Sequence, residues 1–277
     1  MKIDILTLFP EFFQALTNFS IIGRAIEKGL FSFNTVNIRD FSKDKHKRVD
    51  DYPFGGGPGM VMKPEPIYDA LLSVKDNDSF VIYLSPQGIL YNQEVAKKLA
   101  SKKHLILICG HYEGIDNRIV ENYVDMELSI GDYVLTGGEI PAMVVVDSIV
   151  RLIPGVLSSQ EAYMDESHYN GLLEYPQYTR PREFNEFKVP EVLLSGNHEE
   201  IRKWRKYQSL KNTYIKRPDL LEKRKLSKEE IAMLEEIKKL IWKLYFTHLY
   251  VIIHKVSTTD GPLPFKSVKN IYVEGRF

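Results

Sequence analysis

A glycine-rich loop, DDYPFGGGPGM at residues 50–60, has the composition of a ligand-binding loop. Glycines at positions 55–57 and 59 let backbone amides approach a bound group closely, as phosphate and nucleotide loops require. Two common nucleotide motifs are excluded, because no Gly-Lys-Ser or Gly-Lys-Thr follows and Met60 stands where the last glycine of a dinucleotide fingerprint belongs. The alternative is a plain turn in which Asp50 and Asp51 are solvated acids.

Three further loops follow apolar runs and are rich in glycine or proline: SPQG at 85–88, CGHYEGIDNR at 109–118 and SIGDYVLTGGEIP at 129–141. In an open α/β sheet, ligands bind outside the carboxyl ends of the strands. The loops together therefore predict one shared pocket. They lack the nucleophile and base arrangement expected of a hydrolase.

Several polar residues in these loops also have purely structural explanations. Cys109 has the position of a core residue on a strand, and Tyr112 and Tyr133 fit half-buried packing roles. His111 and Glu113 could act as acid and base, and a surface histidine is the alternative. The residues alone leave these alternatives open.

A second set of charged residues lies farther along the chain. Arg151 ends a long apolar segment, where a cation complements a helix macrodipole, and Asp165 and Glu166 lie in a polar stretch where acids are usually solvated. From Arg202 to Lys225 there are ten basic residues and two acidic ones, although the whole chain has 37 of each sign. This basic block is a candidate to bind a polyanion.

The segments that carry the glycine loops alternate between strand and helix patterns up to about Pro154. Short apolar runs separated by helices predict a parallel sheet covered on both faces, which is an α/β fold. We expect strands at 3–8, 35–38, 80–84, 105–109 and 126–130, and helices at 21–28, 65–74, 93–99 and 140–152.

The rest of the chain has a different pattern. Residues 158–190 are polar, carry three prolines and show no sustained period, which predicts a linker. Segments 198–210 and 227–246 have helical apolar spacing, and Ser227 followed by Glu230 is a capping-box signature. We expect two short strands around a Gly-Pro turn at 251–277, and no role follows from that segment.

Composition sets further bounds on the protein. With 277 residues, 44% hydrophobic and 27% charged, the chain is typical of a globular protein with about two domains. No apolar run approaches the roughly 18 residues of a membrane span, and the N-terminal run contains Asp4 where a signal peptide would be apolar, so we expect a cytoplasmic protein. One cysteine and seven scattered histidines predict neither a disulfide nor a structural metal site.

In chain order, these motifs resemble the bacterial tRNA (guanine-N1)-methyltransferase family of the trefoil-knotted SPOUT methyltransferase superfamily. The resemblance covers residues 1 to about 220, in IDILTLFPEFF, SIIGRAIEKG, VDDYPFGGGPGM, LSPQG, CGHYEGIDNR, SIGDYVLTGGEIPAM, RLIPGVL, GLLEYPQYTRP and WRKYQSLKNTYIKRPDLL. It implies a deep knot near 85–140, which the general rarity of knots would otherwise exclude. The implied organisation is a knotted α/β catalytic domain at 1–160, a linker at 161–190, a small helical tRNA-binding domain at 191–250 and a tail at 251–277.

The resemblance also implies a methyl donor, S-adenosylmethionine, bound in the knot. The family is homodimeric with sites that draw on both subunits, and it suggests a magnesium ion. Glycine and proline dominate the expected donor site because they shape the path of the chain. Its residues are Leu84, Pro86, Gly110, Tyr112, Glu113, Ile130, Gly131, Asp132, Tyr133, Val134, Leu135 and Gly138.

The implied substrate is guanosine-37 of tRNA, beside the anticodon, methylated at N1. This nitrogen carries a proton and is a poor nucleophile, so transfer needs a base and a cation that stabilises the charge developing on O6. By resemblance, the cation is Arg151 and the base is Glu166, at a position where the family has aspartate. The adjacent Asp165 is the alternative base.

By the same resemblance, Asp50 and Gly59 hold the guanine, and Arg202, Lys203 and Lys206 contact the anticodon arm through phosphates. Two other functions stay open. A noncatalytic RNA-binding protein that keeps the fold is expected if the substituted acid abolishes the chemistry. An α/β enzyme acting on a free nucleotide would have no use for the basic block.

Overall fold

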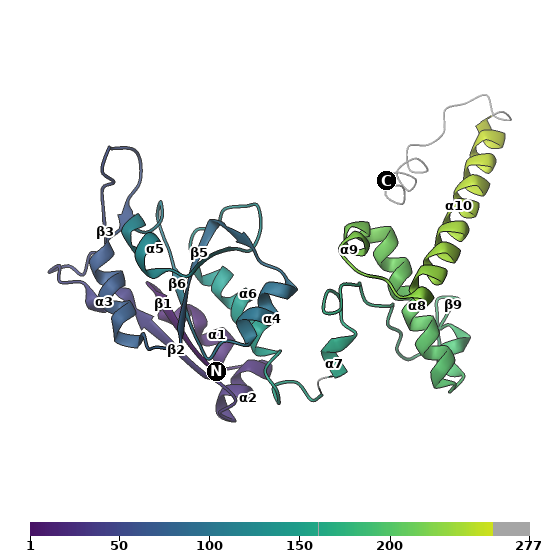
Figure 1. The fold of residues 1–277 in the computed structure, drawn as a ribbon, viewed down its shortest axis with the longest axis horizontal. Coiled ribbons are helices and arrows are strands. Elements are labelled where there is room, and N and C mark those ends of the chain that lie inside the picture. Colours follow the sequence, from purple (N-terminus) through teal and green to yellow (C-terminus); the bar gives the residue numbers. More distant parts are fainter. Residues whose placement is uncertain (160, 257–277) are drawn as a thin grey trace. The chain divides into compact units, whose positions relative to one another are not determined.

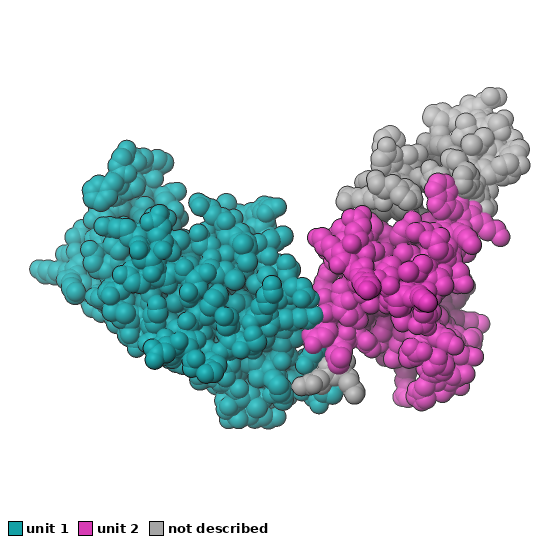
Figure 2. Space-filling view, viewed as in Figure 1, with its two compact units in different colours: residues 1–163 teal, residues 164–277 magenta. Residues whose placement is uncertain are grey.

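The structure is a computed structural model that describes residues 1–159 and 161–256. The side chains of Ser20, Glu161, Ala162 and 244–256 lie outside that description. The chain divides into two compact units, unit 1 at Met1–Tyr163 and unit 2 at Met164–Phe277 (Figure 2). Each unit has its own hydrophobic core.

Unit 1 is built on a five-stranded parallel sheet with the order β2-β1-β6-β5-β7 (Figure 1). A helix lies in each connection between successive strands of this sheet, as parallel pairing requires. The predicted α/β class with a parallel sheet is therefore confirmed. The strands are β1 (Lys2–Thr7), β2 (Ser32–Asn37), β5 (Ser79–Leu90), β6 (His104–Cys109) and β7 (Met126–Ser129).

Local chemistry sets where the helices of unit 1 begin. The side chain of Asn92 accepts hydrogen bonds from the first amides of α4, Asp116 does so for α5, and a proline opens α3. The sequence pattern does not predict α5, because Ile119 is its one buried residue. The helices are α2 (Ser20–Glu27), α3 (Pro64–Val74), α4 (Gln93–Ala100), α5 (Asn117–Tyr123) and α6 (Glu139–Val150). Shorter elements are the 3-10 helices Pro10–Phe13 and Ile38–Phe41, α1 (Gln14–Thr17), and the antiparallel pair β3 (Asp50–Asp51) and β4 (Val61–Met62).

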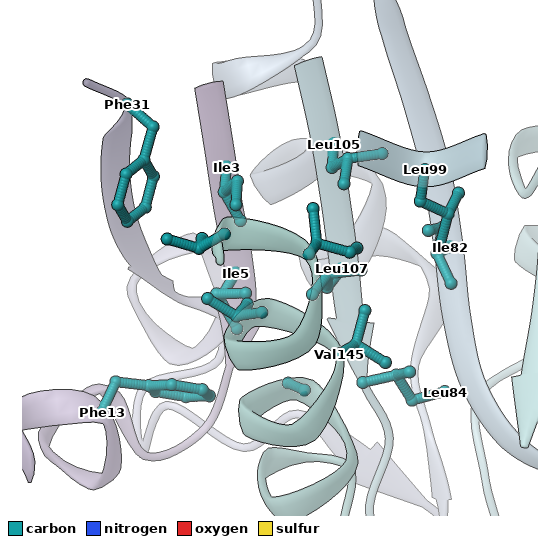
Figure 3. Packing of buried hydrophobic residues seen from close by; sticks show 14 of the residues in the cluster. Ile3, Ile5, Phe13, Phe31, Ile82, Leu84, Leu99, Leu105, Leu107 and Val145 are labelled. Carbon is teal, nitrogen blue, oxygen red and sulfur yellow. The ribbon is translucent and has the colours of Figure 1, made fainter. Parts of the chain in front are cut away.

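Both faces of the sheet are buried. On one face, Ile5 and Leu107 pack with Val145 of α6 in a large apolar cluster (Figure 3). On the other face, Leu6 and Ile106 belong to a cluster with residues of α3 and α5. Successive strand residues point to opposite faces, so burial on both sides explains the continuous apolar runs of β1 and β6.

The strand β5 is longer than the one predicted at 80–84. Leu84 and Ile89 both pair with Leu128 of β7, so residues 85–88 are extra chain on one side of the ladder. A Cβ at Gly88 would collide with the backbone of Glu127 and Leu128, which explains the glycine. The SPQG segment is therefore a bulge within the strand, and the expected loop is corrected accordingly.

Unit 2 is mainly helical in the part that the structure describes. It contains α8 (His198–Lys216), α9 (Pro218–Glu222) and α10 (Lys228–Val256), and Leu210 packs with Ile237 at its centre. The predicted capping box is confirmed. Ser227 Oγ accepts a 3.2 Å hydrogen bond from the Glu230 amide, and Glu230 Oε2 accepts one of 2.7 Å from the Ser227 amide.

One prediction for the C-terminal half needs correction. The stretch predicted to be a linker contains short elements, namely α7 (Glu161–Met164) and the paired strands β8 (Glu183–Phe184) and β9 (Phe187–Lys188), and the 3-10 helix Glu191–Leu194 follows it. Helix α10 continues to Val256, so the strand prediction is wrong at residues 251–256. Their β-branched residues favour strands locally, but they continue an established helix. The rest of that prediction, at 257–277, lies outside the described residues.

Candidate active site

Three glycine-bearing segments of unit 1, at 85–88, 109–118 and 129–141, line one cavity of about 270 Å³ at the carboxyl ends of β5, β6 and β7. The shared pocket expected from the sequence is present. Asp132, one of the twelve residues expected to contact the donor, is exposed and does not line it. The other eleven do: Leu84, Pro86, Gly110, Tyr112, Glu113, Ile130, Gly131, Tyr133, Val134, Leu135 and Gly138. Lining residues that the sequence did not single out include Ser85, Gln87, Ser129, Thr136 and Pro141.

Glycines join two of these loops through the backbone. The amide of Gly138 donates to the carbonyl oxygen of Gly110 at 3.0 Å, and His111 forms an isolated antiparallel bridge with Gly137. A Cβ at Gly138 would lie 2.6 Å from Cα of Cys109, so this position admits no side chain without a backbone shift. The wall of the cavity is thus fixed by main-chain contacts.

Two tyrosines flank the cavity with half-exposed rings. Tyr112 is 50% exposed and Tyr133 is 55% exposed, which fits the half-buried state expected from the sequence. Tyr112 has a left-handed φ of 57°, a conformation that is unfavourable for a residue with a bulky side chain. Strain of this kind is concentrated at functional sites. The rings provide apolar surface that a bound ligand can cover.

A buried carboxylate lies beside the cavity at the start of α6. Oε2 of Glu139 is 2.8 Å from Nε2 of His111, and its Oε1 accepts a 2.6 Å hydrogen bond from Oγ1 of Thr7. Burial works to raise the pKa of Glu139, but the hydrogen bonds from His111 and Thr7 outweigh it and leave the pKa below its ordinary value. A surface histidine is therefore the wrong interpretation of His111. The sequence signal for Glu139 is an acid in the first turn of an apolar helix.

The glycine-rich loop reaches the same region of unit 1. Its glycines at 55–57 and 59 have φ between 78° and 120°, a range that residues with a Cβ rarely adopt. A Cβ at Gly59 would collide with the carboxylate of Glu113, and the Glu113 amide donates to the Met60 carbonyl oxygen at 3.0 Å. The structure therefore brings Gly59, expected to hold the guanine, against a residue of the donor cavity.

Asp50 and Asp51 form the short strand β3 at the base of that loop. Asp50 is half-buried and pairs through the backbone with Met62 of β4. Hydrogen bonds from the Tyr52 amide and then from the Lys63 side chain lower the pKa of Asp51, and the Lys63 ammonium lies 3.4 Å away. Asp51 is thus engaged in holding the loop.

The expected catalytic residues belong to different units. Arg151 of unit 1 is half-buried and follows α6, with its amide 3.3 Å from the Asp147 carbonyl oxygen. Since α6 begins at the donor cavity and has 12 residues, Arg151 lies about 18 Å along the helix from it. In unit 2, Glu166 is half-buried, and its carbonyl oxygen accepts a hydrogen bond from the Tyr169 amide at 3.3 Å; Asp165 is exposed.

The three cations expected to contact tRNA lie on α8. The shortest contacts of Arg202 and Lys203 with Glu199 are 2.9 Å and 3.6 Å, and Lys206 is 2.8 Å from Glu229. Solvent-exposed ion pairs of this kind contribute about 0–1 kcal/mol. These cations can therefore exchange their partners for phosphate groups at little cost.

The chain matches the family model described as tRNA (Guanine-1)-methyltransferase TrmD over residues 1–223. The chain belongs to this family. Curated proteins named tRNA (guanine-N(1)-)-methyltransferase are similar to it. The one from Dictyoglomus turgidum is 59% identical over 239 residues, which cover 86% of this chain and 97% of the relative. Those from Ruminiclostridium cellulolyticum and Clostridium novyi are 62% and 60% identical, over 80% and 86% of this chain and 97% and 99% of the relatives.

A tRNA (guanine-1)-methyltransferase needs a methyl donor, and the cavity fits S-adenosylmethionine chemically. Leu84 and Ile130 offer apolar surface to a purine. The carboxylate of Glu113 can attract the positive charges of the donor. The family implies this donor, and eleven of the residues expected to bind it line the cavity.

The remaining observations on this tRNA (guanine-1)-methyltransferase concern its one thiol, metal ligands and the apolarity of its helices. Cys109 is fully buried, and burial and then the nearby Glu139 raise its pKa well above the ordinary value, so it is a core residue as predicted and no thiolate nucleophile. Among the described residues, no group of three or more His, Cys, Asp and Glu side chains is arranged to hold a metal ion. The helices in the described ranges include none long and apolar enough to cross a membrane.

Proposed function

We propose that this chain transfers the methyl group of S-adenosylmethionine to N1 of guanosine-37 in tRNA. The observation that carries the proposal is the convergence of three glycine-bearing segments on one cavity in a chain of the tRNA (guanine-1)-methyltransferase family. The curated relatives carry the name of this activity at about 60% identity. Their near-complete coverage supports an active enzyme over a noncatalytic RNA-binding protein.

The donor would be held in the cavity by apolar contacts from Leu84 and Ile130, against a wall that the hydrogen bond between the Gly138 amide and the Gly110 carbonyl oxygen keeps in place. When bound, S-adenosylmethionine supplies an electrophilic methyl group on a positively charged sulfur. The protein excludes water from this group with the rings of Tyr112 and other half-exposed side chains. The Glu139 carboxylate fixes the loop through His111 and does not touch the donor.

The acceptor nitrogen is prepared by a base and a cation. Glu166 accepts the N1 proton of guanine, and the Arg151 guanidinium stabilises the negative charge that develops on O6. Glutamate keeps the carboxylate of the family's aspartate on a side chain longer by one methylene. Asp50 and Gly59 hold the guanine, and Gly59 is suited to this because it lies against Glu113 of the donor cavity.

The enzyme works as a homodimer in this proposal. The separation of about 18 Å between the two ends of α6 supports a site that combines the cavity of one subunit with Arg151 of the other. The segment 85–140 forms the family's trefoil knot in this proposal, and the hydrogen bond between Gly138 and Gly110 lies within that segment. The basic residues Arg202, Lys203 and Lys206 hold the anticodon arm. The proposal also includes a magnesium ion and a cytoplasmic location, and both of these rest on the family alone.

Mass spectrometry of nucleosides tests this function directly. An unmodified tRNA transcript with guanosine at position 37 is incubated with the protein and S-adenosylmethionine, digested and analysed. We expect 1-methylguanosine at position 37 and none in a matched transcript with adenosine there. Tight tRNA binding without methylation would favour the noncatalytic alternative, and methylation of free guanosine nucleotides would favour the free-nucleotide enzyme.

A further inference from the structure

Unit 2 contains a second cavity, of about 470 Å³, which the donor site does not use. Its floor includes apolar residues such as Leu172 and Ile201, and cationic side chains dominate its charge. Arg202, Arg205, Lys206 and Arg224 line it, against the two acids Asp165 and Glu230. The lining therefore carries an excess of two positive charges, with His198 counted as neutral.

Arg224 distinguishes this cavity from an ordinary basic surface. Its side chain is only 25% exposed, and its Nη2 donates a 2.8 Å hydrogen bond to Oε1 of Glu230. Its other terminal nitrogen, Nη1, is buried and has no hydrogen-bond partner among the described residues. Buried polar groups in folded proteins are nearly always hydrogen-bonded, and an unpaired charged donor is especially costly. Because Nη1 has almost no solvent-accessible surface, an acceptor in the cavity would satisfy this donor after a small shift of the Arg224 side chain.

The nearby carboxylate does not cancel this charge completely. Glu230 already accepts hydrogen bonds from Arg224 at one oxygen and from the Ser227 amide at the other. That geometry is fixed by the capping box of α10, so Glu230 orients the guanidinium and leaves Nη1 to another acceptor. An arginine held by a salt bridge at one terminal nitrogen keeps a second terminal nitrogen that can bind an oxyanion once it is exposed.

The remaining cations are placed on α8 and can move to a ligand. Arg205 lies over the ring of Tyr175, with its Cζ 4.8 Å from the centroid, so its guanidinium is oriented while its edge can still donate. Arg202 and Lys206 form exposed ion pairs with Glu199 and Glu229. Such pairs are weak and readily replaced by a more highly charged oxyanion.

We propose that this cavity is a discrete subsite for one phosphate group of the RNA backbone, with the partly buried guanidinium of Arg224 shifting to donate through Nη1 and Arg205 and Lys206 beside it. The assignment to RNA rests on the proposed function, because a tRNA substrate would supply the phosphate. Free phosphate has the same chemistry and is the other source to be distinguished. The subsite would fix the register of the RNA on unit 2, beyond the general attraction of the basic block.

The test compares tRNA binding by three single variants with that of the wild-type full chain. Arg224→Gln and Arg205→Gln each remove one cation of the cavity, and Lys239→Gln removes an exposed cation of α10 outside the basic block. Affinity for unmodified tRNA is measured by fluorescence anisotropy at several salt concentrations. We expect about a tenfold to hundredfold loss for Arg224→Gln, a slope of log affinity against log salt smaller by about one, and little change for Lys239→Gln.

A second arm uses inorganic phosphate alone. We expect phosphate to raise the melting temperature of the wild-type chain above that in chloride of equal ionic strength, and to have no such effect on Arg224→Gln. If phosphate stabilises the wild type but Arg224→Gln binds tRNA normally, the source is free phosphate and the assignment to RNA is wrong. If neither measurement responds to Arg224→Gln, the cavity is no phosphate site.

Two controls keep the outcome decisive. If Arg224→Gln unfolds unit 2, as the tryptophans Trp204 and Trp242 would report, Arg205→Gln decides the matter, because the exposed Arg205 stacks its guanidinium on Tyr175 and its loss should leave unit 2 folded. Methylation by the wild type is measured in parallel. Failure of the proposed function would appear as unmethylated tRNA with the wild type, whereas failure of the subsite would leave methylation and tRNA affinity intact in both arginine variants.

Discussion

Nε2 of His111 lies 2.8 Å from Oε2 of Glu139, and this pair joins the loop after β6 to the first turn of α6. The same carboxylate accepts a hydrogen bond from the hydroxyl of Thr7 at the end of β1. Three segments that are distant in sequence therefore depend on one buried acid beside the donor cavity.

Replacing Glu139 should lower the stability of unit 1. Glu139→Ala leaves His111 and the Thr7 hydroxyl without their buried acceptor, and we expect a loss of about 1–3 kcal/mol in the free energy of unfolding. Urea denaturation followed by hydrogen exchange reads unit 1 separately from unit 2. The control Glu94→Ala, an exposed acid paired with Lys97, should change stability by less than about 0.5 kcal/mol. Equal losses in the free energy of unfolding for the two substitutions would show that the buried carboxylate stabilises unit 1 no more than an exposed one does.

The two glycines of the donor loop should respond differently to substitution. A Cβ at Gly131 would collide with the ring of Tyr133, which can move, and the φ of 157° strains any residue with a side chain, so Gly131→Ala should weaken S-adenosylmethionine binding at a modest cost in stability. A Cβ at Gly138 meets the backbone of Cys109, so Gly138→Ala, and valine even more, should also lower stability. Calorimetry of donor binding and thermal unfolding separate the two effects.

A double substitution checks the route by which Gly131→Ala acts. If it works by displacing Tyr133, the change should have little further effect in a Tyr133→Ala background. Fully additive losses of donor affinity would point to a direct clash with the ligand. Unchanged donor affinity in all the glycine variants would remove this loop from the site.

The choice of base can be decided by isosteric substitutions. If Glu166 accepts the N1 proton, Glu166→Gln should lower the single-turnover methylation rate by about 10² to 10⁴ with tRNA affinity little changed. Glu166→Asp should retain activity, and Asp165→Asn should methylate nearly normally because Asp165 lines the cavity of unit 2. The opposite pattern would assign the base to Asp165. Activity in both single variants would leave Arg151 and substrate positioning to carry the catalysis.

Charge reversal on α8 should separate RNA binding from donor binding. The triple substitution of Arg202, Lys203 and Lys206 by glutamate should weaken tRNA binding strongly and reduce its dependence on salt. Donor affinity should stay the same, because the donor cavity belongs to unit 1. Reversal of Lys238 and Lys239 on α10 is the control for net charge. A wild-type tRNA affinity that is flat with salt would mean that the basic block is only a solvated helix face.

Acid stability should depend on Asp76. The hydrogen bond from His104, at 2.9 Å, is the main reason that its pKa is lowered from 3.8 to about 2, and Ser79 adds to the effect. Because the folded pKa lies below the unfolded one, this contribution to stability is present above about pH 4 and is lost as the pH falls towards 2. Asp76→Asn should therefore flatten the fall in melting temperature over that window. Asp78→Asn, which removes the partner of Lys103, should leave the slope unchanged.

Burial explains which elements the sequence could predict. Strands β1 and β6 are packed on both faces, so their apolar runs are continuous, and α6 is apolar enough to be placed within two residues. Helix α5 escapes prediction because Ile119 is its one fully buried residue, so its apolar face is short and weakly marked. In the tail, residues 251–256 have strand-forming side chains, and their helical state comes from the chain before them.

The candidate site could be predicted from the sequence only in part. Glycine spacing predicted a shared pocket, but only the resemblance to a family indicated which residues line it and what they bind. The contact of His111 with Glu139 depends on how two loops pass each other, and local periodicity carries no information about that. The cavity around Arg224 was invisible for the same reason, because Asp165 and Arg224 meet there from distant parts of the chain.

The strand order has a consequence for how this protein is made. Ile5 of β1 pairs with Leu107 of β6, so one edge of the first strand to leave the ribosome has no partner until about a hundred more residues have been synthesised. At cellular rates of translation this wait lasts roughly 5 to 20 s. During that time an apolar edge is available to any other nascent chain, and such edges template aggregation. Recombinant yield should therefore improve with slower initiation, lower temperature or more holding chaperone, even though the finished sheet hides that edge completely.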